Sequence, residues 1–214
     1  MKSIAVFGLG RFGMSLAENL YHYGVDVLAV DKDEKIIDSI SDRVTYAVAA
    51  ELSDPSAIKE LGIGQMDTVV VAMGTDLEAS IISVMVAKEE GVPMVIAKAA
   101  NERMGVILKK VGADKIIYPE KEGGARTAKI LMSDNFLEFF DIDDNLCLVE
   151  MHPKKEWIGK SLRELNLRDE YKLNVVAVKD ASEMRSFIDP DRPLEDDTDL
   201  LVVIEKKDLK SLDD

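Results

Sequence analysis

The stretch that decides the fold is Ile4-Ala5-Val6-Phe7-Gly8-Leu9-Gly10-Arg11-Phe12-Gly13, near the start of this 214-residue chain. Its apolar run predicts a buried strand, and the Gly-x-Gly-x-x-Gly spacing predicts a tight turn that opens a helix. Asp31 closes the next apolar run, 18 residues after Gly13. Strand, glycine turn, helix, strand and acid in this register are typical of a nucleotide-binding βαβ unit.

Glycine is needed at each of these three positions for a different physical reason. Gly8 makes the tight turn, Gly10 lets a diphosphate approach the backbone, and Gly13 lets the helix pack closely on the strand. Asp31 would accept hydrogen bonds from both ribose hydroxyls and would repel a 2′-phosphate, which disfavours NADP. The alternative is that the glycines serve only a tight turn.

The same alternation continues to about residue 132. Strand-like runs are Ile4–Phe7, Val25–Val30, Thr45–Ala49, Thr68–Ala72, Met94–Ala97 and Lys115–Ile117, and helical patterns are Phe12–Tyr23, Asp33–Ser41, Pro55–Leu61, Leu77–Glu90, Glu102–Val111 and Gly124–Met132. Strands apolar on both faces and joined by helices form parallel sheets. The sequence therefore predicts an α/β fold with a Rossmann-like, doubly wound parallel sheet.

The pattern changes after residue 133. Residues 134–214 hold 22 acidic and 12 basic side chains, against 19 and 15 in residues 1–133. Helical and strand patterns are interleaved in this second part. A helix-like pattern covers Ser161–Leu167, and strand-like runs are Leu146–Met151, Leu173–Val178, a short Met184–Ile188 and Leu200–Ile204. We expect a nucleotide-binding lobe over 1–133, a linker or crossover over 134–145, and a small α+β lobe over 146–214.

Ligands of doubly wound sheets bind outside the carboxyl ends of the strands. The candidate binding residues at those ends are Gly8, Gly10, Arg11, Phe12, Gly13, Asp31, Lys32, Glu51, Met73, Gly74, Lys98 and Glu120. Arg11 and Lys98 could pair with phosphates, which suits a multiply charged phosphate chain. Glu51 could accept a hydrogen bond from an adenine amino group. The alternative for these charged side chains is ordinary solvent exposure.

Composition narrows the function classes. The net charge of −14, without clustered Lys and Arg, argues against a nucleic-acid partner. A single cysteine, Cys147, and two distant histidines, His22 and His152, give no metal-ligand spacing and no good general acid or base. No apolar run reaches 18 residues, so we expect a cytosolic protein that docks on a membrane protein at most. Leu77–Lys88 is apolar nearly all round, which predicts burial in the domain or in a subunit interface.

Several segments together resemble a known family. They are the glycine stretch, Leu28-Ala29-Val30-Asp31, Val71-Ala72-Met73-Gly74, Ala97-Lys98-Ala99-Ala100-Asn101 and Gly112-Ala113-Asp114-Lys115-Ile116-Ile117-Tyr118-Pro119-Glu120. They closely resemble the cytosolic regulatory subunits of Ktr/Trk potassium-uptake systems, the KtrA type, which are regulator-of-K⁺-conductance (RCK) proteins. The resemblance spans essentially the whole chain and is weakest after residue 145.

The resemblance implies a regulator without catalysis. Dimers would assemble into an octameric ring beneath an integral membrane K⁺ transporter subunit of the KtrB/TrkH type, with ATP favouring and ADP disfavouring the active state. Arg11 would lie near the terminal phosphate of ATP, and Glu120 would belong to a dimer-interface site for a divalent cation, Mg²⁺ or Ca²⁺. Glu51 departs from the Asp or Asn usual in the family. Some members bind cyclic di-AMP in the second lobe, but that site has no secure match here.

Two other functions stay open from the residues alone. One is a small NAD-dependent oxidoreductase with residues 134–214 as its substrate domain, although the sequence offers no good acid or base for it. The other is an NAD(H)-sensing regulator, because the glycine turn and Asp31 serve NAD as well as ATP. Only Arg11 and the family resemblance favour ATP and ADP.

Overall fold

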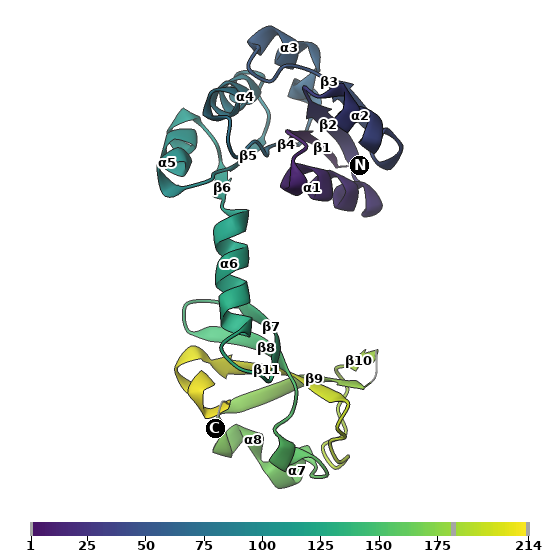
Figure 1. The fold of residues 1–214 in the computed structure, drawn as a ribbon, viewed down its shortest axis with the longest axis vertical. Coiled ribbons are helices and arrows are strands. Elements are labelled where there is room, and N and C mark those ends of the chain that lie inside the picture. The colour runs from purple at the N-terminus through teal and green to yellow at the C-terminus, as the bar shows by residue number, and fades with distance from the viewer. Residues whose placement is uncertain (1, 181–182, 213–214) are drawn as a thin grey trace. The chain divides into compact units, whose positions relative to one another are not determined.

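The computed structural model describes residues 2–180 and 183–212. They form two compact units, and the division falls between Lys121 and Glu122. Each unit has its own sheet, as Figure 1 shows, and buried side chains give each unit its own hydrophobic core. Among the helices of the described residues, none combines the length and the apolar composition of a membrane span.

Six parallel strands form the sheet of the first unit in the order β3-β2-β1-β4-β5-β6. Strands and helices alternate along the chain: β1 (Ser3–Phe7), α1 (Arg11–His22), β2 (Asp26–Asp31), α2 (Glu34–Ile40), β3 (Tyr46–Ala49), α3 (Pro55–Glu60), β4 (Thr68–Val71), α4 (Leu77–Glu89), β5 (Met94–Lys98), α5 (Glu102–Val111) and β6 (Lys115–Ile117). The strand order reverses at β1, which lies between β2 and β4. The predicted doubly wound sheet is confirmed.

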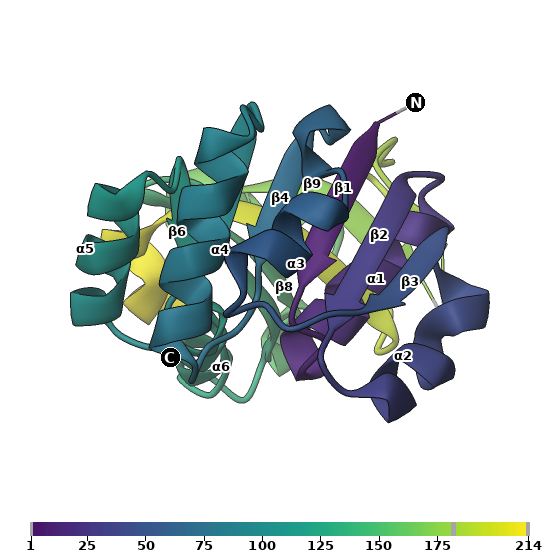
Figure 2. The same ribbon diagram turned by 90° about the horizontal axis from the view of Figure 1, so that it is seen from above.

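Helices cover both faces of this sheet, because successive residues of a strand point to opposite sides. Ile4 and Val6 of β1 pack in one cluster with α1 and α2. Ala5 and Phe7 of the same strand pack in the other cluster, with α3, α4 and α5. Figure 2 shows α3 and α4 in front of the sheet and α1 behind it. Burial on both faces explains why these strands have continuous apolar sequences.

The N-terminus of α1 is capped differently from the N-termini of α2 to α5. Four of them have a side-chain N-cap, namely Asp33, Asp54, Asp76 and Asn101. The cap of α1 is Gly10, which offers no side chain, and the first turn of α1 contains no acid. The N–H groups at the start of α1 are therefore left for another acceptor.

Helix α4 is only partly buried, although its sequence is apolar nearly all round. Six of its residues are buried, and they are Ala79, Ser80, Ser83, Val84, Val86 and Ala87. Leu77 and Met85 remain 38% and 44% exposed. The predicted burial within the domain is thus found over one side of the helix.

The second unit is built on a five-stranded antiparallel sheet in the order β10-β9-β11-β8-β7. Its strands are β7 (Phe136–Asp141), β8 (Leu146–Met151), β9 (Leu173–Asp180), β10 (Glu183–Arg185) and β11 (Thr198–Glu205). Short helices accompany them: η3 (Lys155–Trp157), α7 (Leu162–Leu165), α8 (Leu167–Glu170) and η4 (Lys206–Leu212). The buried Trp157 belongs to this core, and its ring meets the Tyr171 ring edge-on at 4.9 Å between centroids.

Three expectations from the sequence are corrected here. Residues 134–145 are not simply a linker, because β7 pairs with β8 as an edge strand of the second sheet. Helix α6 (Pro119–Ile130) begins five residues before the expected Gly124, and the division between the units falls within it. The helix expected over Ser161–Leu167 is interrupted at Asn166, whose φ of 44° lies in the left-handed region.

Ion pairs with α6 explain how the acidic segment of β7 forms a strand. Arg126 of α6 bonds to Glu138 and lies 5.0 Å from the Phe140 ring, while Lys129 pairs with Asp141. Phe136 and Phe139 are buried in the core of this unit, and the Lys129 ammonium lies 5.0 Å from the centroid of the Phe139 ring. The acidic composition that suggested a linker therefore belongs to a strand whose acids meet bases from a helix.

Candidate functional site

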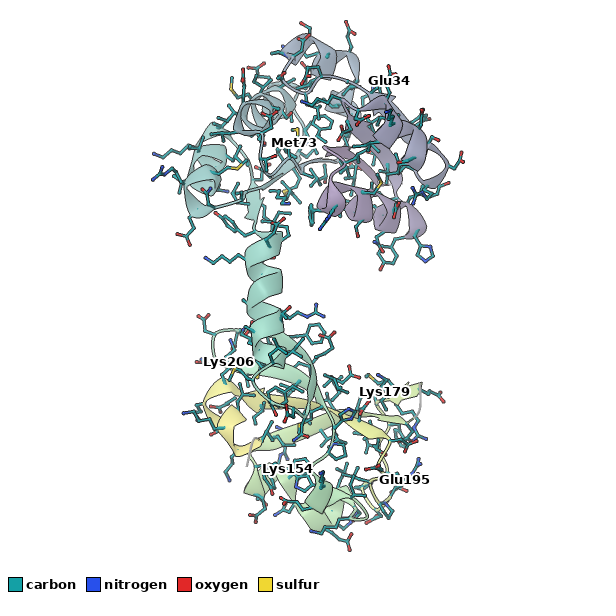
Figure 3. The ribbon with its side chains drawn as sticks, in the orientation of Figure 1. Glu34, Met73, Lys154, Lys179, Glu195 and Lys206 are labelled. Atoms are coloured by element: carbon teal, nitrogen blue, oxygen red, sulfur yellow. The ribbon has the colours of Figure 1, made fainter. Side chains whose placement is uncertain are left out.

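A cleft of about 480 Å³ opens at the carboxyl ends of the strands of the first unit. It lies where the strand order reverses, as expected for this fold. Its lining contains every candidate binding residue except Gly13, together with five that the sequence did not single out: Leu52, Ala72, Thr75, Asp76 and Ala79. Met73, labelled in Figure 3, follows β4 and borders the cleft. The sequence thus predicted which residues meet, and their binding roles remain predictions.

The glycine turn has the geometry that its spacing predicts. Gly8 has a φ of +88°, a region that favours glycine, and its N–H donates to the Val30 carbonyl at 2.8 Å. A Cβ on Gly13 would lie 1.9 Å from the Gly8 carbonyl oxygen, so only glycine allows α1 to approach this closely. A Cβ on Gly10 would meet nothing within 4 Å, which leaves that backbone open to a ligand.

Asp31 fixes the turn from the end of β2. One carboxylate oxygen accepts a hydrogen bond from the Leu9 N–H at 2.7 Å, and the other accepts from the Asp33 N–H at 3.0 Å. Each oxygen keeps a further lone pair for a ribose hydroxyl. Asp31 therefore holds the glycine turn in place, and its role toward a ribose stays a prediction.

Three cationic side chains line the cleft, and the two predicted phosphate partners among them, Arg11 and Lys98, have different surroundings. Arg11 is exposed, and its guanidinium forms no ion pair with the carboxylates of the described residues. The Lys98 side chain is 11% exposed, and its Nζ lies 2.6 Å from Glu120 Oε1 and 5.6 Å from the Phe12 ring centroid. Gly74 leaves room for it, because a Cβ there would lie 3.4 Å from Nζ. A bound phosphate would thus find one unpaired and one paired cation.

Glu120 is the second residue of α6. Its carboxylate pairs with Lys98, and both side chains line the cleft. The hydrogen bond from the Lys98 ammonium holds the pKa of the Glu120 carboxyl below its usual value. Because a lowered pKa keeps the group ionised, the pair persists at neutral pH and is lost only as the pH falls through that pKa. Over the described residues, no group of three His, Cys, Asp or Glu side chains could hold a metal ion. The role of Glu120 as a cation ligand stays a prediction.

The far wall of the cleft comes from the segments after β3 and β4. Glu51 Oε1 accepts from the Ser53 hydroxyl at 2.9 Å, so one of its oxygens is already engaged. Asp76 faces the cleft while its carboxylate caps α4 at the Ala79 N–H, 3.0 Å away. The position of Asp76 just before a helical pattern could have marked it as a cap, but sequence alone did not bring it to the cleft.

Neither histidine lies in the cleft. His22 is exposed in the last turn of α1, and His152 lies in the second unit with Nδ1 at 2.6 Å from Asp199 Oδ1. Cys147 is buried in the second core, where burial raises the pKa of its thiol. None of these three groups is among the residues that line the cleft of the first unit.

Two family models match the chain, the TrkA-N domain over residues 4–119 and the TrkA-C domain over residues 147–214. Ktr system potassium uptake protein A of Bacillus subtilis (strain 168) is 34% identical over 209 residues, which are 98% of this chain and 94% of that protein. The chain belongs to the TrkA family. Ktr system potassium uptake protein A of Vibrio alginolyticus is also 34% identical, over 99% of this chain and 98% of that protein. The resemblance drawn from the motifs is confirmed.

Solved structures share the fold. The crystal structure of the GsuK RCK domain superposes with a TM-score of 0.67 at 16% identity, over 99% of this chain and 47% of that one. A structure described as the GsuK channel bound to NAD gives a TM-score of 0.67 at 15% identity, over 99% of this chain and 38% of that one. The TrkA-N domain of the Escherichia coli inner membrane protein ybaL gives 0.55 at 18% identity, over 61% and 96%. At these identities the likeness concerns the fold alone.

Proposed function

We propose that this chain is a regulatory subunit of a Ktr-type potassium-uptake system and that it binds ATP and ADP in the cleft of its first unit. The observation that carries the proposal is the convergence of four features on one cleft. They are the glycine turn, the uncapped start of α1, the Asp31 carboxylate and the cations Arg11 and Lys98. Relatives named as Ktr potassium uptake proteins over nearly the whole chain support the transport role.

The fit to a nucleotide follows from the charges. The start of α1 presents N–H groups and the positive end of the helix dipole to an anion. Asp31 would accept hydrogen bonds from the ribose, and the exposed Arg11 would reach the terminal phosphate. ATP brings a γ-phosphate that ADP lacks, so the two nucleotides would make different contacts with Arg11.

The proposed regulation of the transporter depends on a difference in nucleotide affinity between two conformational states. A ligand shifts a conformational equilibrium only by its difference in affinity for the two states. A coupling of about 1–3 kcal/mol per site, repeated over a symmetric assembly, would change the activity of a transporter. We place the chain on the cytoplasmic side, as dimers in an octameric ring against a membrane K⁺ transporter subunit of the KtrB/TrkH type. Binding of nucleotide, without chemistry on it, is the proposed activity.

NAD(H) is the second candidate ligand. The glycine turn and the oriented Asp31 would hold the adenosine half of NAD as they hold ATP. On this alternative the chain would be a redox-sensing regulator. A cyclic di-AMP site in the second unit stays a prediction.

The deciding measurement is calorimetric titration of the purified, nucleotide-stripped protein with ATP, ADP, NADH and NAD⁺ in one buffer with fixed salt and Mg²⁺. We expect ATP and ADP to bind and NADH to bind more weakly. NADH binding without ATP or ADP binding would overturn the proposed switch and favour the redox-sensing regulator.

Glu120→Gln tests the predicted cation role. Gln cannot supply a charged ligand, so we expect Mg²⁺ or Ca²⁺ to lose its stabilising effect on the ATP complex, measured as a shift in melting temperature. The affinity for ATP itself should persist. Glu102→Gln is the matched control, because Glu102 forms a comparable exposed ion pair with Lys121 at 2.8 Å outside the cleft. An unchanged cation response in Glu120→Gln would remove Glu120 from the cation site.

A further inference from the structure

Helix α4 contains two serines that are fully buried, Ser80 and Ser83, each with 0% exposure. The other buried residues of this helix are Ala and Val. Burying a hydroxyl without a hydrogen bond is unfavourable, so the partner of each serine identifies its role. At a spacing of three residues, both serines lie on the same side of the helix.

Ser83 reaches a segment far away in the sequence. Its Oγ donates to the carbonyl oxygen of Leu52 at 3.3 Å, 31 positions earlier in the chain. Leu52 follows β3 and lines the cleft next to Glu51. The Ser83 hydroxyl therefore holds the segment after β3 from the side opposite to the cleft.

Ser80 does the same for the segment after β4. Its Oγ lies 2.9 Å from the Met73 carbonyl oxygen and 2.6 Å from that of Asp76. The single hydroxyl proton of Ser80 is shared between these two carbonyls. The contact with Asp76 stays within the first turn of α4, whereas the contact with Met73 ties α4 to the end of β4. Met73 and Asp76 both line the cleft, whereas Ser80 and Ser83 do not.

The segments after β3 and β4 form the part of the cleft wall that the proposed function assigns neither to the phosphates nor to the ribose. With the glycine turn and Arg11 assigned to the phosphates and Asp31 to the ribose, as proposed above, the lining residues left for the base are Glu51, Leu52 and those from Met73 to Ala79, of which Gly74 also lies beside Lys98. We propose that Ser80 and Ser83 are positioning residues that set the base side of the nucleotide cleft through main-chain hydrogen bonds. The proposal rests on nucleotide binding in this cleft and adds what fixes its base selectivity.

The proposal gives α4 a second role. The same helix presents Leu77 and Met85 on its exposed side and holds both base-side segments on its buried side. A movement of α4 would therefore be transmitted to the base side of the cleft through two hydrogen bonds, without any serine touching the ligand.

The test compares Ser80→Ala and Ser83→Ala with the control Ser39→Ala. Ser39 is exposed on α2, and its Oγ donates to the Ile36 carbonyl at 2.7 Å outside the cleft. Alanine fits wherever serine fits, and it is a good helix former, so the variants should fold. The readouts are the affinities for ATP and for inosine triphosphate, which keeps the ribose and phosphates but lacks the adenine amino group, and amide hydrogen exchange of the ligand-free protein.

Each α4 variant is expected to weaken ATP about fivefold, the loss expected for one hydrogen bond, and to weaken inosine triphosphate less. Exchange should become faster at residues 50–54 in Ser83→Ala and at residues 73–76 in Ser80→Ala, with no change in Ser39→Ala. Equal weakening of both nucleotides, or unchanged exchange in both segments, would overturn the positioning role. If the unmutated protein binds no nucleotide, the proposed function fails, and the exchange data alone decide whether the serines hold these segments.

Discussion

Gly13→Ala is expected to destabilise the first unit strongly and to abolish nucleotide binding. The new Cβ would lie 1.9 Å from the Gly8 carbonyl oxygen and 3.0 Å from its carbonyl carbon, so backbone would have to move. Neither partner is a flexible side chain. Overpacking of this kind costs about 3 kcal/mol, a large share of the stability of a domain of this size. Chemical denaturation of the ligand-free protein would measure the loss.

Gly10→Ala is the matched comparison. Gly10 has a φ of −64°, which alanine adopts without strain, and its Cβ would enter open space. Stability without ligand should therefore change little, while the methyl group would obstruct the approach of a diphosphate to the turn. Loss of stability in Gly10→Ala, or full stability in Gly13→Ala, would contradict the geometry of the turn. Unchanged nucleotide affinity in Gly10→Ala would contradict phosphate binding there.

Arg11→Ala is expected to weaken ATP far more than ADP. Arg11 is exposed beside the cleft and forms no ion pair in the described part of the chain, so its guanidinium is available to a terminal phosphate. A hydrogen bond to a charged group contributes about 2 kcal/mol, or roughly thirtyfold in affinity. ADP, which lacks the γ-phosphate, should lose much less. Calorimetric titration of both nucleotides measures the difference.

The control for this variant is Arg103→Ala. Arg103 is also exposed in the first turn of a helix, α5, but lies outside the cleft. It should change both affinities little, apart from the weak effect of total charge. Equal losses of ATP and ADP affinity in Arg11→Ala would exclude Arg11 as the residue that distinguishes the nucleotides.

Local patterns predicted the first unit well because parallel strands buried on both faces carry an unmistakable apolar signal. The glycine spacing predicted the turn, and the rule that ligands meet the carboxyl ends of strands brought residues as distant as Arg11 and Lys98 to one cleft. The wall residues Leu52, Thr75 and Ala79 were missed, since their side chains carry no chemical signal of binding.

The elements of the second unit and of α6 were predicted less accurately from the sequence. The acids of β7 resembled a linker because the bases that meet them, Arg126 and Lys129, belong to α6. The start of α6 at Pro119 was also missed, although proline is favoured in the first turn of a helix. The first error comes from pairings between elements, which no single segment displays, whereas the second overlooked a signal that the segment itself carries.

The amino-acid sequence by itself determined the parallel sheet, the glycine turn, the acid at residue 31 and the family, because spacing and periodicity are local properties of the chain. Tertiary structure alone decided that Lys98 is paired with Glu120, that Asp31 anchors the turn at Leu9, and that Ser80 and Ser83 hold the wall of the cleft. These contacts join residues 7 to 31 positions apart, and only packing of the whole unit brings such groups within hydrogen-bonding distance.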